Sequence, residues 1–180
     1  MNMDFSTFRL VRLTDEQLIR PFDCGNSEVN NYLLENAKSY DKQLLSVTYL
    51  IENTEQTAAF FSLTNDRITL ESTPITGRWK KYFYEYLPIG KKYISYPAVK
   101  IVQLGVDKSV QHHEMGTAVV DFIKRWQMNN RFTGCRFITV EGMKDALPFY
   151  EKNGFYYMTN DDVDSHTRIM YYDLKRLEEV

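Results

Sequence analysis

Residues 111–117, with the sequence Gln-His-His-Glu-Met-Gly-Thr, form a polar stretch between an apolar run and a helical pattern. The run Val99 to Val106 is typical of a buried strand, and the spacing of apolar residues from Thr117 to Met128 is typical of an amphipathic helix. The N–H groups at a helix N-terminus have no partner within the helix, and they attract anions. Strand, loop and helix together therefore predict an anion-binding site at His112 to Thr117.

Tyr150 lies in a second helical pattern, Ala146 to Lys152, which stops at Asn153-Gly154. A glycine after a helix can take the left-handed conformation that ends it. The tyrosine itself has two interpretations, because its ring can belong to the core and its phenol can donate a proton. The residue pattern alone favours the core.

Strand and helix patterns extend over most of the chain. The expected strands are residues 8–13, 44–51, 57–63, 99–106, 135–140, 155–158 and 169–174, and the expected helices are residues 27–40, 117–128 and 146–152. The first helix follows Asp23-Cys-Gly-Asn-Ser, which supplies cap residues. Residues 66–97 have no clear periodicity and are expected to be a long connection with a short helix at 77–86. Helices among a mainly antiparallel sheet predict an α/β (α+β) fold, in a single domain spanning residues 1–180.

Composition limits the classes of protein. The chain has 180 residues, of which 43% are hydrophobic and 26% are charged, so a packed globular protein is expected. A net charge of −2 gives no overall attraction to nucleic acid or to anionic membranes. Cys24 and Cys135 do not form a paired motif, so we expect reduced thiols, no metal site and a cytoplasmic location without a membrane segment.

Three motifs in chain order resemble the GNAT superfamily of N-acetyltransferases. They are the strand Val99-Lys-Ile-Val-Gln-Leu-Gly-Val-Asp, the loop Gln111-His-His-Glu-Met-Gly-Thr, and Ala146-Leu-Pro-Phe-Tyr-Glu-Lys-Asn-Gly-Phe. In addition, Phe22-Asp-Cys-Gly-Asn-Ser-Glu-Val-Asn-Asn-Tyr-Leu resembles the opening of the branch that includes toxin-antitoxin enzymes acetylating aminoacyl-tRNA. The resemblance covers nearly the whole chain and implies a GNAT-like mixed, mainly antiparallel sheet flanked by helices.

The resemblance implies an enzyme that transfers an acetyl group from acetyl-CoA to a primary amine in a ternary complex, without a metal. Tyr150 occupies the position of the general acid that protonates the departing thiolate. The implied cofactor-binding residues are Leu104, Gly105, Val106, Gln111, His112, His113, Glu114, Met115, Gly116 and Thr117. The first three would pair with the pantetheine arm, and the loop would bind the pyrophosphate.

The loop departs from the family pattern at two positions. Glu114 stands where the family has its first glycine, and His112 stands where a further glycine is common. A carboxylate facing a pyrophosphate is repelled by about 1 kcal/mol at 4 Å in water. These residues leave open a second hypothesis, in which a degenerate GNAT domain serves as a binding or interaction module.

The general base and the acceptor amine stay open. Asp66, Glu71 and Glu141 are candidate bases, as is a chain of water, and Met143 stands where many relatives have an asparagine. An acidic turn at Asn160 to Asp164 either attracts a cationic amine or is simply solvated.

A basic and aromatic loop at Arg78 to Lys100 carries six Lys or Arg and one Glu, a net charge of +5. Such a loop suits a tRNA partner, because aromatic rings stack on exposed bases. It is equally suited to a homodimer contact or to completing the core. If the branch resemblance carries function, the acceptor is an aminoacyl-tRNA, and a separate antitoxin chain is an expected partner.

Overall fold

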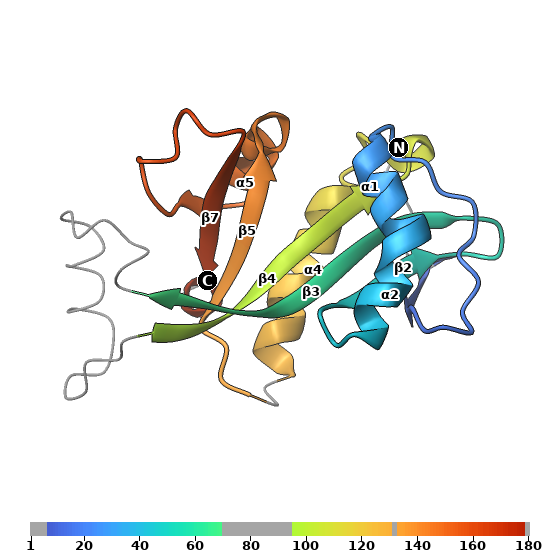
Figure 1. Cartoon of the computed structure of the whole chain (residues 1–180), viewed down its shortest axis with the longest axis horizontal. Helices are drawn as coiled ribbons and strands as arrows, with labels where there is room; N and C mark the ends of the chain where they lie inside the picture. The colour runs from blue at the N-terminus through green and yellow to red at the C-terminus, as the bar shows by residue number, and fades with distance from the viewer. Residues whose placement is uncertain (1–6, 70–94, 131–132, 179–180) are drawn as a thin grey trace. The chain divides into compact units, whose positions relative to one another are not determined.

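The computed structural model describes residues 7–69, 95–130 and 133–178. Seven strands form one sheet in the order β1-β2-β3-β4-β5-β7-β6. The pairs β1/β2, β2/β3, β5/β7 and β6/β7 are antiparallel. The predicted α/β fold with a mainly antiparallel sheet is therefore confirmed (Figure 1).

The described residues divide into two compact units. The first contains residues up to 64 and residues 101–126, and the second contains residues 65–100 and the chain from 127 onward. Strands β3 (Thr57–Thr69) and β4 (Ser95–Val106) each contribute to both.

The first unit begins with strand β1 (Arg9–Arg12) and continues with a helical segment. That segment comprises α1 (Ser27–Asn31), the π-helical turn η2 (Tyr32–Asn36) and α2 (Ala37–Lys42), followed by β2 (Val47–Glu52). The predicted cap is confirmed, because Oδ1 of Asn26 accepts hydrogen bonds from the N–H groups of Glu28 and Val29 at 2.9 and 3.2 Å. The π-helical turn was not predicted.

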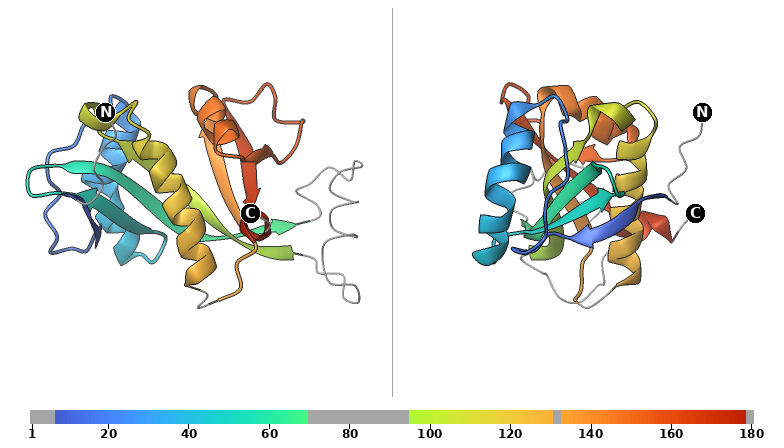
Figure 2. Two further views of the ribbon diagram at one scale, coloured as in Figure 1. Left: turned by 180° about the vertical axis from the view of Figure 1, so that it is seen from behind. Right: turned by 90° about the vertical axis from the view of Figure 1, so that its right-hand side faces the viewer.

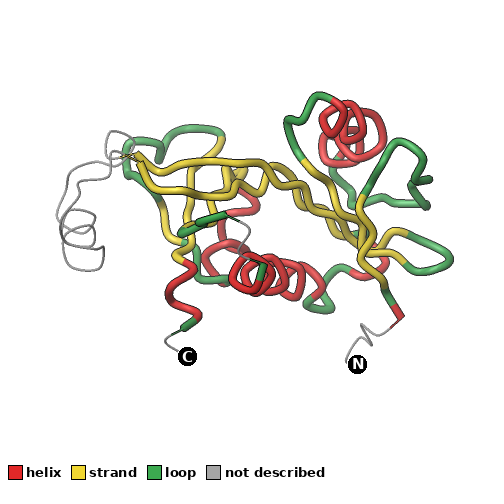
Figure 3. Tube along the Cα trace, turned by 90° about the horizontal axis from the view of Figure 1, so that it is seen from below, coloured by secondary structure: helices red, strands yellow, loops and turns green. Residues whose placement is uncertain are grey.

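Two helices cover opposite faces of the strands in the first unit. Leu50 and Phe60 pack against Leu33 of the first helical segment. Their neighbours Tyr49 and Phe61 point to the other face, as alternation along a strand requires. There they meet Trp126 of helix α4 (Met115–Asn129), with ring centroids 4.8 and 6.2 Å apart. Figures 2 and 3 show α4 and the first helical segment on the two faces.

The second unit contains β5 (Phe137–Met143), the turn η4 (Lys144–Ala146), α5 (Leu147–Lys152), β6 (Tyr156–Tyr157), β7 (Thr167–Asp173) and η5 (Leu174–Leu177). Its core includes Ile68, Tyr96, Phe137 and Tyr171. The predicted left-handed glycine after α5 is confirmed, because Gly154 has a φ of 77°.

Several predicted boundaries were wrong. The strand expected from Leu44 begins at Val47, because Leu44 (φ 58°) and Leu45 close the preceding helix by donating to Asp41 O and Tyr40 O. The connection expected at 66–97 is shorter, because β3 runs to Thr69 and β4 starts at Ser95. The strand expected from Cys135 starts at Phe137 and runs on to Met143. The short helix expected at 77–86 lies outside the described residues.

Gly105, the next-to-last residue of strand β4, has no room for a side chain. A Cβ atom there would lie 2.6 Å from Cε1 of Phe60 and 3.0 Å from both Phe22 Cζ and Val29 Cγ1. Phe60 is fully buried, so its ring cannot move away without disturbing the core. Packing alone therefore accounts for a glycine at this position.

We predict that Gly105→Ala lowers the free energy of unfolding by about 1–3 kcal/mol, because it overpacks this core. Gly134→Ala is a matched control, since no atom of the described residues lies within 4 Å of a Cβ built there. The control should change stability by less than about 0.5 kcal/mol. Urea unfolding of both variants measures the difference, and equal midpoints would contradict the packing argument.

Candidate active site

The predicted cofactor-binding residues lie at the end of β4, in the loop that follows it and at the start of α4. Strand β4 ends at Val106, the short turn η3 covers Lys108–Val110, and residues 111–114 form a turn that leads into α4 at Met115. Residues 104–117, the predicted cofactor-binding stretch, all belong to the first unit. The predicted order of strand, loop and helix is correct.

His112 and Glu114 have φ angles of 62° and 63°. This left-handed conformation is the one that glycine adopts without steric cost. Any other residue pays roughly 1–2 kcal/mol there. The two positions where the sequence departs from the glycine pattern therefore keep a glycine-like backbone.

The N–H groups at the start of α4 remain available. Ala118 N–H donates to Glu114 O at 2.9 Å, and no described residue accepts a hydrogen bond from the N–H groups of residues 112–117. Successive unpaired N–H groups around left-handed residues form a concavity that binds anions. The side chains of His112, His113 and Glu114 are exposed, whereas that of Met115 is buried, so Met115 offers a ligand only its backbone.

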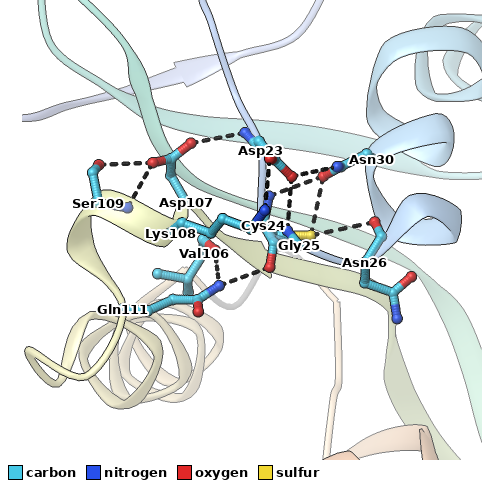
Figure 4. Close-up of polar contacts among 10 residues, drawn as sticks. All are labelled: Asp23, Cys24, Gly25, Asn26, Asn30, Val106, Asp107, Lys108, Ser109 and Gln111. Carbon is cyan, nitrogen blue, oxygen red and sulfur yellow. Dashed lines mark hydrogen bonds and ion pairs between the residues drawn. The ribbon is translucent and has the colours of Figure 1, made fainter.

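The side chain of Gln111 is bonded within the protein. Its side-chain Nε2 donates to Val106 O and to Cys24 O, both at 2.8 Å (Figure 4). An amide nitrogen carries two protons, and both are used in these bonds. Gln111 therefore supports the loop, and its Nε2 is not free to bind a phosphate.

Asp23, Asp107 and Lys108 complete a network that sequence reasoning missed. Asp107 Oδ2 accepts the N–H of Asp23 at 2.8 Å, and Lys108 Nζ donates to Asp23 Oδ2 at 2.9 Å. Hydrogen bonds from Lys108, Asn30 and the N–H of Gly25 lower the pKa of Asp23 to about 2. A signal was present, because an Asp at the end of a strand and an Asp-x-Gly turn both favour side-chain to backbone bonds.

Asp107 is a buried carboxylate that stays ionised. Burial alone would raise its pKa, but hydrogen bonds from the N–H of Asp23 and from Ser109 lower it. Its Oδ1 accepts from the N–H and the Oγ of Ser109 at 2.9 and 2.7 Å. The first turn after β4 is thereby capped.

Tyr150 lies on α5 in the second unit. Its ring is buried and packs edge-on against Phe149 and Phe155, and Gly142 leaves space beside it. Among the described residues, the Tyr150 hydroxyl has no hydrogen-bond partner. Burial raises the pKa of Tyr150, which keeps the phenol protonated at neutral pH.

Among the candidate bases, Glu141 already accepts two side-chain hydrogen bonds. Its oxygens accept from Lys100 Nζ and Thr167 Oγ1, each at 2.9 Å, and these bonds lower the pKa of Glu141. A lowered pKa makes a weaker base. Asp66 accepts hydrogen bonds from Thr139 Oγ1 and from the N–H of Arg67, while Glu71 lies outside the described residues.

The acidic turn between β6 and β7 has a structural role. Oδ1 of Asp162 accepts from Arg168 Nε and its Oδ2 from the N–H of Ile169, both at 2.9 Å. The guanidinium of Arg168 stacks 3.8 Å from the ring centroid of Tyr157. Asp162 is therefore not free to hold a cationic amine.

The basic and aromatic loop at 78–100 lies outside the described residues up to position 94, and its remainder, 95–100, belongs to β4. Within the described part of the chain, no three His, Cys, Asp or Glu side chains gather as a metal site requires. No helix in the described ranges is long and apolar enough to cross a membrane.

We predict that Glu114→Gly and His113→Gly affect stability differently, although the residues are neighbours. Glu114 has a left-handed backbone and His113 does not. A glycine at 114 removes a steric cost of about 1 kcal/mol, whereas a glycine at 113 adds about 0.5–1 kcal/mol of chain entropy.

Chemical unfolding should therefore show Glu114→Gly to be at least about 1 kcal/mol more stable than His113→Gly. Equal stability of the two variants would mean that the loop does not hold the left-handed conformation in solution.

No family model matches the chain, and no curated protein is significantly similar to it. Solved toxin structures do match. A bacterial toxin aligns with a TM-score of 0.76 at 13% identity, over 96% of this chain and 93% of that chain. AtaT complexed with acetyl-methionyl-tRNAfMet aligns with a TM-score of 0.76 at 18% identity, over 96% and 98%. A tyrosine-to-phenylalanine variant of KacT aligns with a TM-score of 0.73 at 20% identity, over 94% and 98%.

At these identities the likeness establishes the fold. It agrees with the resemblance to the toxin-containing GNAT branch that the motifs indicate. The chain therefore has the fold of the AtaT and KacT toxins.

Proposed function

We propose that this protein is an acetyl-CoA-dependent N-acetyltransferase. The observation that carries the proposal is the loop at 112–117, where two non-glycine residues hold a left-handed backbone and successive N–H groups have no acceptor among the described residues. A chain that accepts this steric cost gains an anion-binding concavity. A pyrophosphate suits such a site, because it offers several acceptor oxygens and a high negative charge.

The residues present fit this ligand, and the negative charge of Glu114 is the one feature that opposes it. Glu114 places a carboxylate beside the loop, but its side chain is exposed and points into water. Repulsion at 4 Å in water is about 1 kcal/mol, which is small beside the binding energy of a millimolar ligand, about 4 kcal/mol. Backbone groups would hold the pyrophosphate, and Leu104, Gly105 and Val106 would pair with the pantetheine arm.

Acetyl-CoA would supply the acetyl group as a thioester. The acceptor nitrogen forms the new amide bond to the acetyl carbon and releases one proton to solvent, while the carbon–sulfur bond breaks and the sulfur leaves as a thiolate. We assign Tyr150 as the proton donor to that thiolate. Since its pKa is raised, the phenol keeps its proton as pH rises and loses it only above the ordinary range near pH 10.

For the acceptor, we propose the α-amino group of an aminoacyl-tRNA. AtaT, with the same fold, has been solved with acetyl-methionyl-tRNAfMet. The net charge of +5 on residues 78–100, in a chain of net charge −2, supports a local contact with RNA. A separate antitoxin chain is a proposed partner, since AtaT has also been solved with the C-terminus of the antitoxin AtaR.

The cofactor proposal predicts a thermal shift. At 100 times its dissociation constant, acetyl-CoA should stabilise the protein by about 2.7 kcal/mol. For a chain of this size that corresponds to a rise in Tm of about 5–10 °C. An acetyl thioester without the pyrophosphate should give little shift at the same concentration. If millimolar acetyl-CoA leaves Tm unchanged, the enzyme proposal fails and the degenerate binding module is favoured.

The catalytic proposal predicts that Tyr150→Phe slows acetyl transfer by roughly 10²–10⁴, because the thiolate loses its proton donor. The thermal shift with acetyl-CoA should persist in this variant. Tyr156→Phe, on the exposed side of β6, is the matched control and should transfer at the wild-type rate.

The assay follows labelled acetyl groups from acetyl-CoA onto aminoacyl-tRNA, and onto a panel of amines and protein N-termini. Unchanged transfer by Tyr150→Phe would remove Tyr150 from its role. Label on amines and none on aminoacyl-tRNA would keep the acetyltransferase and reject the tRNA acceptor.

A further inference from the structure

Gln111 connects two segments that are far apart in sequence. One proton of its side-chain amide bonds to Val106 O at the end of β4, and the other bonds to Cys24 O just before helix α1, both at 2.8 Å. The residue is half-buried, and its side chain spans from the loop at 111–114 to the turn at 23–25. Movement of either segment breaks at least one of these bonds.

Asp107 joins the same two segments by independent bonds. Its Oδ1 caps the turn at Lys108–Val110, while its Oδ2 accepts the N–H of Asp23 at 2.8 Å. The N–H of Lys108 donates in turn to Asp23 O at 2.9 Å. The backbone of Asp23 is therefore bonded on both its N–H and its carbonyl to the start of the loop.

The turn at 23–25 is itself bonded to helix α1. Oδ1 of Asp23 accepts from Gly25 N–H and from Asn30 Nδ2, both at 2.8 Å. Oδ1 of Asn30 accepts the N–H of Cys24 at 3.0 Å. Figure 4 shows the resulting continuous path of hydrogen bonds from the loop to the first turn of α1.

We propose that Gln111 and Asp107 are positioning residues that couple acetyl-CoA binding at residues 112–117 to the order of the N-terminus of α1. The inference rests on the proposed function, because it takes acetyl-CoA as the ligand of the loop. A ligand that restricts the loop restricts the bonded turn at 23–25 and, through Asn30, the first turn of α1. Coupling is reciprocal, so a partner that disorders α1 weakens cofactor binding by the same factor.

The exposed ion pair between Lys108 and Asp23 carries little of this coupling. Their side chains are 60% and 56% exposed, and surface ion pairs contribute little to stability. Gln111 and Asp107 are less exposed than Lys108 and Asp23, so water competes less for their hydrogen bonds. The test therefore targets these two residues.

Hydrogen exchange with the full-length protein tests the coupling. In the wild type, saturating acetyl-CoA should slow amide exchange in a peptide covering residues 23–31. Gln111→Met keeps the length of the side chain and removes both donors, so this slowing should be lost. The dissociation constant of acetyl-CoA should rise about 5- to 20-fold, within the usual range of coupling between sites. Asp107→Asn, which retains one carbonyl oxygen, should show the same two effects and serves if Gln111→Met fails to fold.

Gln127→Met is the matched control, because it makes the same chemical change on α4 outside this network. It should retain both the affinity and the slowed exchange. If the wild type does not bind acetyl-CoA, the proposed function fails first and this inference fails with it. If the wild type binds but exchange at 23–31 is unaffected, or if the slowing survives in Gln111→Met, the coupling is overturned while the proposed function stands.

Discussion

The carboxylate of Asp107 fixes the point at which β4 ends. The N–H of Asp107 makes a bond to Ala58 O at 2.8 Å, while its side chain turns the chain into Lys108–Val110. The loop at 111–114 and the start of α4 follow this corner directly along the chain. Their positions therefore depend on where β4 ends. A buried, ionised carboxylate suits this task, since each of its oxygens accepts from a different segment.

The corner also explains how a strained loop is tolerated. Left-handed backbone at His112 and Glu114 costs roughly 1–2 kcal/mol each, a sizeable part of the 5–15 kcal/mol by which proteins are stable. Such conformations persist only where neighbouring bonds fix the chain on both sides. Here Asp107 and Gln111 do so before the loop, and the first helical bond of α4, from Ala118, does so after it.

Much of this arrangement could be predicted from the sequence. The apolar periods of β4 and α4, the cap before α1 and the glycine after α5 are local signals, and each was correct. The extension of β3 to Thr69 was missed, because Asn65-Asp-Arg reads as a polar loop and only Ile68 enters the core, through contacts with residues far along the chain. The bonds of Gln111 and Asp23 were missed for the same reason, since they join segments more than 80 residues apart. The π-helical turn η2 has no sequence signature that periodicity detects.

Strands β3 and β4 have a consequence for synthesis of the chain. Because each strand serves both compact units, neither unit is one uninterrupted segment. The first unit consists of residues up to 64 and residues 101–126, and the ribosome makes residues 65–100 between them. The part of β4 in this unit and helix α4 are therefore missing until residue 126 has been made. Synthesis at roughly 5–20 residues per second leaves one face of the N-terminal strands uncovered for several seconds. The nascent chain is therefore exposed to aggregation and to chaperones during this interval, and the loop at 111–114 is among the last parts of the first unit to form.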